Sequence, residues 1–178
     1  MRTYFIIILL FLLPFITYGQ KYKSHKSHIR FFSSAPLEDI EAINKESTSI
    51  FNSETNQLVF SIPIKGFQFE KSLMQEHFNE NYLESSKYPT ATFNGKITGF
   101  DKDKTSKQNA KAIGTMKIHG VEKKVEIEGE ITMNNDGITM KAVFPIQVAD
   151  YDIEIPKVVF YNIAEVVEVT VDFSYSKM

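Results

Sequence analysis

Residues 71–100, KSLMQEHFNENYLESSKYPTATFNGKITGF, join a short amphipathic helix to an alternating strand. In the first part, side chains three and four residues apart share one helical face: Leu73, Met74, His77, Phe78 and Tyr82. Ser72 is placed to cap the start of this helix. Pro89 ends any helix, because its ring pushes the preceding residue toward extended geometry. Beyond it the apolar period becomes two, the period of a strand. One helix among strands predicts a barrel with a plug or lid.

Six segments alternate well enough to predict strands. They lie within residues 58–64, 91–99, 112–118, 125–133, 138–146 and 167–175. His119-Gly120 and the turn at residues 134–137 are short links, which predicts a three-stranded antiparallel meander over residues 111–147. Residues 148–163 alternate poorly and contain Pro156, so we expect an irregular excursion there. With the N-terminal segments the total is about eight strands, which predicts an all-β, closed antiparallel barrel with one short α-helix.

The N-terminus is typical of a secretion signal. Arg2 precedes an almost unbroken apolar run over residues 5–16, and Thr17-Tyr18-Gly19 offers a cleavage site. The run is shorter than the roughly 20 residues that a membrane span needs. We therefore predict a signal peptide at residues 1–19 and one soluble domain at residues 20–178, secreted across the inner membrane to the periplasm or outside the cell.

Composition excludes several classes of protein. The chain has no cysteine, so it has no disulfide, no thiolate zinc site, no cysteine nucleophile and no acylated lipoprotein anchor. Its formal net charge is -2, and Arg30 is the one arginine of the predicted mature chain. Nucleic-acid binding usually needs a basic surface with arginine available, so we predict no nucleic-acid partner.

The histidines do not form a metal-binding pattern. His25 and His28 are three residues apart, and on a strand such residues point to opposite faces. His77 belongs to the predicted helix and His119 to a hairpin turn. No spacing resembles a zinc site, so we predict no metal and no cofactor.

Catalytic patterns are equally weak. The serines at residues 33–34 and 85–86 lack a Gly-x-Ser-x-Gly elbow. Glu126, Glu128 and Glu130 share a face opposite an apolar row, as expected of a solvated barrel exterior. The acids of residues 150–154 are the ones that the pattern does not explain. We predict a protein that is not an enzyme.

Three segments resemble the YceI-like family of secreted lipocalin-like proteins. They are SLMQEHFNENYLESSKYPTATFNGKI (72–97), MKIHGVEKKVEIEGEI (116–131) and FFSSAPLEDIEA (31–42), the last similar to the Bacteroidetes-type branch. The resemblance spans roughly residues 22–176. It implies a lipocalin-like barrel that holds a long apolar chain, typically a polyisoprenoid. Local propensity predicts a helix over residues 36–45, whereas the resemblance implies a strand there.

The sequence leaves open whether the barrel is hollow. Eight strands enclose an interior that side chains can fill or that one small ligand can occupy. Gly95, Gly99, Gly114 and Gly129 share the inward parity of their strands, where they leave room or mark bends that close the barrel. The resemblance favours a tunnel. On that hypothesis Gly114→Leu blocks the tunnel while the barrel still folds.

We therefore predict an extracytoplasmic protein that binds an isoprenoid or similar lipid chain. The predicted ligand-binding residues are Phe60, Ile62, Phe78, Tyr82, Phe93, Ile97, Gly114, Met116, Ile127, Ile131, Met140, Phe144, Val169 and Phe173. Two alternatives are a filled-barrel module that binds an envelope protein and an enzyme that acts on a lipid. A homodimer and a membrane-protein partner both stay open.

Overall fold

The computed structural model describes residues 20–134, 137–156 and 163–178. The predicted signal peptide at residues 1–19 lies outside the described residues. The strands are β1 (Lys21–Ser34), β2 (Asp39–Asn44), β3 (Thr48–Asn52), β4 (Gln57–Pro63), β5 (Phe67–Phe69), β6 (Thr90–Thr98), β7 (Lys107–Ile118), β8 (Val121–Asn134), β9 (Gly137–Gln147) and β10 (Val166–Lys177). The helical elements are η2 (Ile64–Gly66), α2 (Ser72–His77), η3 (Phe78–Tyr82) and η4 (Val148–Tyr151).

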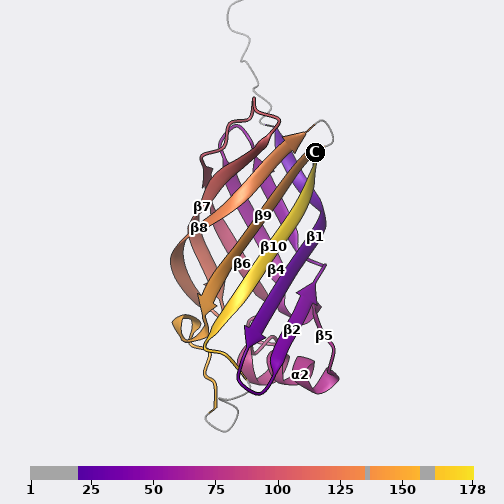
Figure 1. The fold of residues 1–178 in the computed structure, drawn as a ribbon, viewed down its shortest axis with the longest axis vertical. Helices are drawn as coiled ribbons and strands as arrows, with labels where there is room; N and C mark the ends of the chain where they lie inside the picture. Colours follow the sequence, from indigo (N-terminus) through magenta and orange to yellow (C-terminus); the bar gives the residue numbers. More distant parts are fainter. Residues whose placement is uncertain (1–19, 135–136, 157–162) are drawn as a thin grey trace, which may run out of the picture.

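These strands form one antiparallel sheet that closes on itself. β1 pairs with β10, which joins the two ends of the chain and completes the ring. β2 and β3 both pair with β1, one after the other along its length. On their other side, β2 pairs with β5 and β3 pairs with β4. Ten segments therefore make eight positions around the barrel, which confirms the predicted eight-stranded fold. Figure 1 shows α2 at one end of the barrel and the C-terminus at the other.

Asn44 stabilises the two breaks in the barrel wall, one between β2 and β3 and the other between β4 and β5. Its Nδ2 donates to the Pro63 carbonyl oxygen at 2.8 Å, and its Oδ1 accepts from Glu46 N at 2.8 Å and Ser47 Oγ at 3.0 Å. Asn44 is 0% exposed, so these bonds satisfy a side chain that has no access to water. A Cβ on Gly66 would lie 2.8 Å from Nδ2, so it would displace the Asn44 side chain from these hydrogen bonds. The two breaks are thus one structural unit.

Alternation predicted the central strands well. β7, β8 and β9 form the expected meander. The pairing of β7 with β8 starts at Ile118 opposite Val121, and that of β8 with β9 starts at Asn134 opposite Gly137. Residues 39–44 are strand β2, so the helix that propensity favours over residues 36–45 is wrong and the strand is confirmed. Pairing with β1 and β5 overrides a weak local preference here.

The predicted helix cap is wrong. α2 starts at Ser72, and the residue at its N-cap is Lys71, without a side-chain hydrogen bond to the first turn. The helix is also longer than one regular segment, because a π-helical turn, η3, continues it from Phe78 to Tyr82. This change of period rotates the last side chains of the segment relative to a regular α-helix.

The wall of the barrel divides between β8 and β9. These strands pair from Gly129 opposite Ala142 to the turn, whereas residues 121–128 pair with β7 alone and residues 143–147 with β10 alone. Pro145 lies on the β9 side of this seam and has no N–H to donate. Proline is typical of strand edges for that reason. Its position inside a predicted strand was a signal of the seam that alternation alone did not reveal.

The barrel exterior is charged and solvated, as predicted, and it also carries cross-strand ion pairs. Lys111 Nζ lies 2.7 Å from Glu126 and 3.3 Å from Glu128, and Lys141 Nζ lies 2.8 Å from Asp172. These residues point away from the core rows and are solvated. Across the three described ranges, no helix is long and apolar enough to cross a membrane.

Candidate functional site

Three apolar chambers follow one another along the barrel interior. The mouth chamber lies at the α2 end and has a volume of about 360 Å³. The middle chamber has about 110 Å³ and shares Phe31, Phe78 and Val167 with it, among others. The deep chamber has about 60 Å³ and shares Phe60, Phe144 and Val171 with the middle one. The shared residues show that the three are parts of one interior.

The mouth chamber lies between three parts of the chain. They are the end of β1 with β2, the helical segment α2–η3, and the segment that links β9 to β10. The residues lining it are Phe31, Glu38, Ile40, Phe69, Lys71, Leu73, Met74, His77, Phe78, Tyr82, Leu83, Val148, Ile153, Ile155, Ile163 and Val167. All five residues of the predicted helical face belong to this set. That face therefore borders a cavity, and Leu73 on it is 59% exposed.

Polar groups of the mouth chamber are few. Lys71 Nζ forms an ion pair with Glu38, which connects the start of the helical segment to the start of β2. The hydrogen bond that Lys71 donates to the Glu38 carboxylate raises the pKa of Lys71 above its usual value. Burial raises the pKa of Tyr82, which keeps its phenol neutral. The mouth thus combines an apolar lining with one paired charge.

His119 joins two of the segments that line the mouth. Its Nδ1 lies 3.1 Å from the Tyr151 carbonyl oxygen and its Nε2 lies 2.8 Å from Glu84 Oε2. The Tyr88 ring meets the imidazole edge-on, with centroids 4.6 Å apart. A Cβ on the neighbouring Gly120 would lie 2.5 Å from the Tyr88 ring, and its φ is +81°. The β7–β8 turn therefore connects the helical segment to η4.

The middle chamber is lined almost wholly by aliphatic and aromatic side chains. Ile29, Ile62, Met116, Phe144 and Val169 contribute to it from five different strands. Among the described residues that line it, Thr92 is the one with a polar side chain. Such a lining offers a ligand almost no hydrogen-bond partners, so it suits a hydrocarbon.

The deep chamber is narrow because aromatic rings fill much of the barrel there. Phe93 is 1% exposed, and its ring stacks on Phe60 with centroids 5.1 Å apart and planes 15° apart. Gly95 and Gly114 face each other across β6 and β7 beneath this ring. A Cβ on Gly114 would lie 2.4 Å from Asn94 O and 2.9 Å from Phe93 Cζ. The glycines make room for Phe93.

The far end of the deep chamber is closed. Tyr175 and Ile131 line it and are each 1% exposed. Ser49 Oγ donates to the Val59 carbonyl oxygen at 2.9 Å, so the Tyr175 hydroxyl, 2.8 Å away, donates to Ser49 Oγ. Burial raises the pKa of Tyr175 far above its usual value. A buried, hydrogen-bonded tyrosine thus ends the interior.

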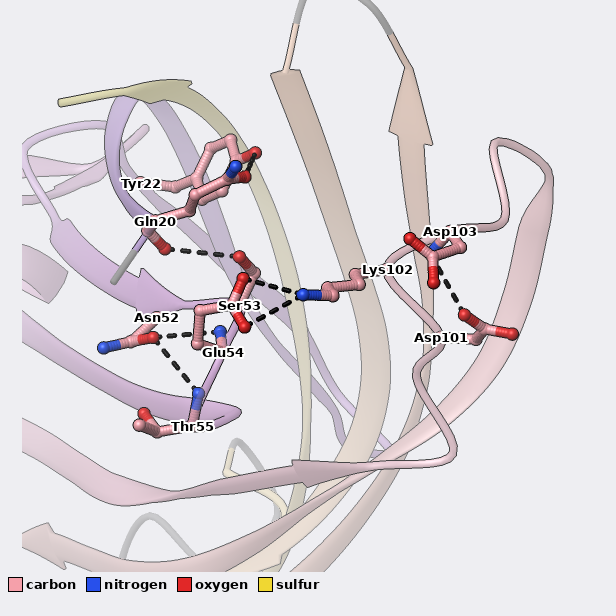
Figure 2. A network of polar contacts seen from close by, with 9 residues as sticks. All are labelled: Gln20, Tyr22, Asn52, Ser53, Glu54, Thr55, Asp101, Lys102 and Asp103. Carbon is pink, nitrogen blue, oxygen red and sulfur yellow. Dashed lines mark hydrogen bonds and ion pairs between the residues drawn. The ribbon is translucent and has the colours of Figure 1, made fainter. Parts of the chain in front are cut away.

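A polar network covers the same end of the barrel from outside. Figure 2 shows Lys102 reaching from the β6–β7 loop to Glu54 in the β3–β4 turn, at 2.8 and 2.9 Å. Ser53 Oγ donates to the Gln20 carbonyl oxygen at 3.3 Å, which adds the start of the described chain. Among the described residues, this network and the buried Tyr175 therefore cover the end of the interior opposite the mouth, where Leu73 is 59% exposed.

The structure places 13 of the predicted ligand-binding residues along these chambers. Tyr82 and Phe78 line the mouth chamber. Phe60, Ile62, Phe78, Met116, Phe144 and Val169 line the middle one. Phe60, Phe93, Ile97, Ile127, Ile131, Met140, Phe144 and Phe173 line the deep one. That these residues bind a ligand stays a prediction.

Gly114 lines none of the three chambers. The sequence left open whether Gly95 and Gly114 leave room or mark bends, and in the structure the backbone of β6 and the Phe93 ring occupy the space over Gly114. The sequence reasoning also missed part of the mouth, namely Phe31, Phe69 and the segment around Ile153. Phe69 lies between Gln68 and Glu70, which was a usable signal, whereas Phe31 stands beside Phe32 and alternation does not single it out. The segment around Ile153 also carries a short signal, because apolar and acidic residues alternate over residues 150–155.

Within the described part of the chain, no group of three or more His, Asp or Glu side chains is arranged to hold a metal ion.

A closed eight-stranded barrel with an apolar interior and a helical segment at its mouth defines a lipocalin-like protein. Residues 22–175 match the YceI-like domain, and the chain belongs to the YceI-like family. The Bacteroidetes-type branch stays a prediction. No curated protein matches the sequence.

Solved structures with the same fold have little sequence identity. A polyisoprenoid binding domain from Saccharophagus degradans, implicated in plant cell wall breakdown, has a TM-score of 0.75 and 14% identity over 88% of this chain and 98% of its own. BcnA of Burkholderia cenocepacia has a TM-score of 0.65 and 16% identity over 84% and 94%. The YceI protein of Campylobacter jejuni has a TM-score of 0.57 and 16% identity over 80% and 86%.

Proposed function

We propose that this protein binds a polyisoprenoid-type lipid outside the cytoplasm and holds its hydrocarbon chain in the barrel. In this proposal it carries or buffers the lipid and performs no reaction on it. The predicted signal peptide supports the extracytoplasmic location. The polyisoprenoid binding domain of Saccharophagus degradans, which has the same fold, supports the class of ligand.

The observation that carries the proposal is the series of apolar chambers behind an accessible mouth. The mouth chamber, at about 360 Å³, lies within the range of about 300–1,000 Å³ that small-molecule sites occupy. Each buried CH₂ group contributes about 0.8 kcal/mol, so roughly ten of them contribute about 8 kcal/mol before the costs of ordering the chain. Hydrocarbon burial is thus the main favourable contribution to binding at this site, and the costs of association and of ordering the chain offset part of it.

The direct test is native mass spectrometry of the protein purified from its own envelope, followed by extraction of bound lipid. We expect a stoichiometric adduct with the mass of an isoprenoid. A protein that carries no lipid, and that also fails to load with prenyl alcohols, contradicts the proposal and favours the filled-barrel interaction module. Cell fractionation and N-terminal sequencing test the location and the cleavage after residue 19.

A pair of variants tests the place of binding. Ile155 lines the mouth chamber and is half-buried, whereas Val166 is 49% exposed and lines none of the chambers. Ile155→Glu introduces a carboxylate among apolar groups, and we expect prenyl-alcohol affinity to fall by about tenfold or more, since 1.4 kcal/mol already has that effect. Val166→Glu makes a similar change on the exterior and should bind as the wild type. Equal affinity in both variants contradicts binding at the mouth.

A further inference from the structure

Phe60 divides the barrel interior into two parts. It lines both the middle and the deep chamber, together with Phe144 and Val171. Its ring stacks on Phe93 at 5.1 Å and lies 6.1 Å from the Phe173 ring, measured between centroids. A chain that enters from the mouth therefore meets the Phe60 ring before it reaches the deep chamber.

The partition lies halfway along the accessible interior. Along β10, Val167 belongs to the mouth and middle chambers, Val171 to the middle and deep chambers, and Tyr175 to the deep chamber. Each step of four residues covers about 13 Å along the strand. The deep chamber therefore adds about as much length as the middle chamber, although it is narrower.

Phe60 is packed less completely than its neighbour Phe93. Phe93 is held by the glycine pair beneath its ring and is 1% exposed. Phe60 is only half-buried and has a chamber on either side. Replacing the Phe60 ring by a smaller side chain joins two cavities, whereas the same change at Phe93 exposes the glycine backbone of β6 and β7.

We propose that Phe60 determines the length of prenyl chain that this protein buries. This inference rests on the proposed function. Affinity increases with each isoprene unit until the chain end reaches Phe60, because each unit removes more apolar surface from water. Units beyond that length stay outside the mouth and add nothing. The ligand class is thus a prenyl lipid of which a defined number of terminal units is buried.

The test measures dissociation constants for geraniol, farnesol, geranylgeraniol and longer prenyl alcohols, each one isoprene unit longer than the last. For the wild type we expect about a tenfold or greater gain per unit, followed by a plateau. In Phe60→Ala we expect the plateau to move to a longer chain. Phe60→Leu keeps more of the core volume. We therefore expect it to gain less affinity than Phe60→Ala for the same longer prenyl alcohols.

Phe51→Leu is the control for loss of core packing. Phe51 is fully buried and lines none of the three chambers, so its plateau should remain at the wild-type length. If the wild type binds prenyl alcohols and both Phe60 variants keep its plateau, the inference is overturned and the proposed function stands. If the wild type binds no prenyl alcohol, the proposed function fails and the inference fails with it.

Discussion

Gly114→Ala is expected to destabilise the barrel strongly. The added Cβ would lie 2.4 Å from Asn94 O, 2.6 Å from Gly95 Cα and 2.9 Å from Phe93 Cζ. Overpacking typically costs about 1–3 kcal/mol. Two of these three contacts are backbone atoms that cannot rotate away, so we expect the upper end, about 3 kcal/mol. For a domain of this size, that lowers Tm by about 6–12 °C.

Thermal unfolding followed by circular dichroism measures this loss, and urea titration gives the free energy of unfolding independently. Thr115→Val changes the next residue of β7, on the opposite face, where it removes only an exposed hydrogen bond from Lys124 Nζ, and should change the free energy of unfolding by about 0.5 kcal/mol. If Gly114→Ala melts at the wild-type temperature, the space beneath Phe93 is not limiting and the reasoning fails. Gly114→Leu should then fold as well, as the tunnel hypothesis from the sequence expects.

Three further predictions concern individual contacts. Burial raises the pKa of Tyr175 above the value of an unfolded chain, so its contribution to the free energy of unfolding is complete below about pH 10 and is lost as pH rises above that value. Tyr175→Phe should therefore flatten the alkaline decline in Tm, and an unchanged decline contradicts this assignment. Asn44→Ala removes the three hydrogen bonds of a buried side chain and should lower the free energy of unfolding in urea by about 3 kcal/mol or more; a loss below about 0.5 kcal/mol shows that the strand break does not depend on Asn44. His119→Ala removes the contact with the Tyr151 carbonyl oxygen and should speed amide hydrogen exchange around η4, whereas the half-exposed His28→Ala should not; equal exchange in both variants refutes the connection.

Side-chain alternation was sufficient for most of the barrel. It works because a strand with one buried face repeats every two residues. The β7–β8–β9 meander followed from His119-Gly120 and the turn at residues 134–137, since short links force neighbouring strands to pair. Residues 39–44 show the limit of local reasoning, because pairing with β1 and β5 determines their conformation.

The candidate site was predicted less completely. Alternation identifies inward residues such as Phe93 and Met116, but it does not distinguish a residue that fills the core from one that borders a cavity. That distinction depends on what lies across the barrel. Gly114 is the clearest example. It pairs with Gly95 on the neighbouring strand, and the space over it is occupied by the ring of Phe93, two residues before Gly95.

The sequence by itself determined the class of fold, the apolar interior and the helical face at one end, because local periodicity controls all three. The tertiary structure alone decided that the interior consists of three chambers, that Phe60 separates two of them and that Asn44 fixes the strand breaks. These features depend on register and on contacts between residues distant in the chain. Register places Gly95 opposite Gly114, and no local pattern in either strand specifies that pairing.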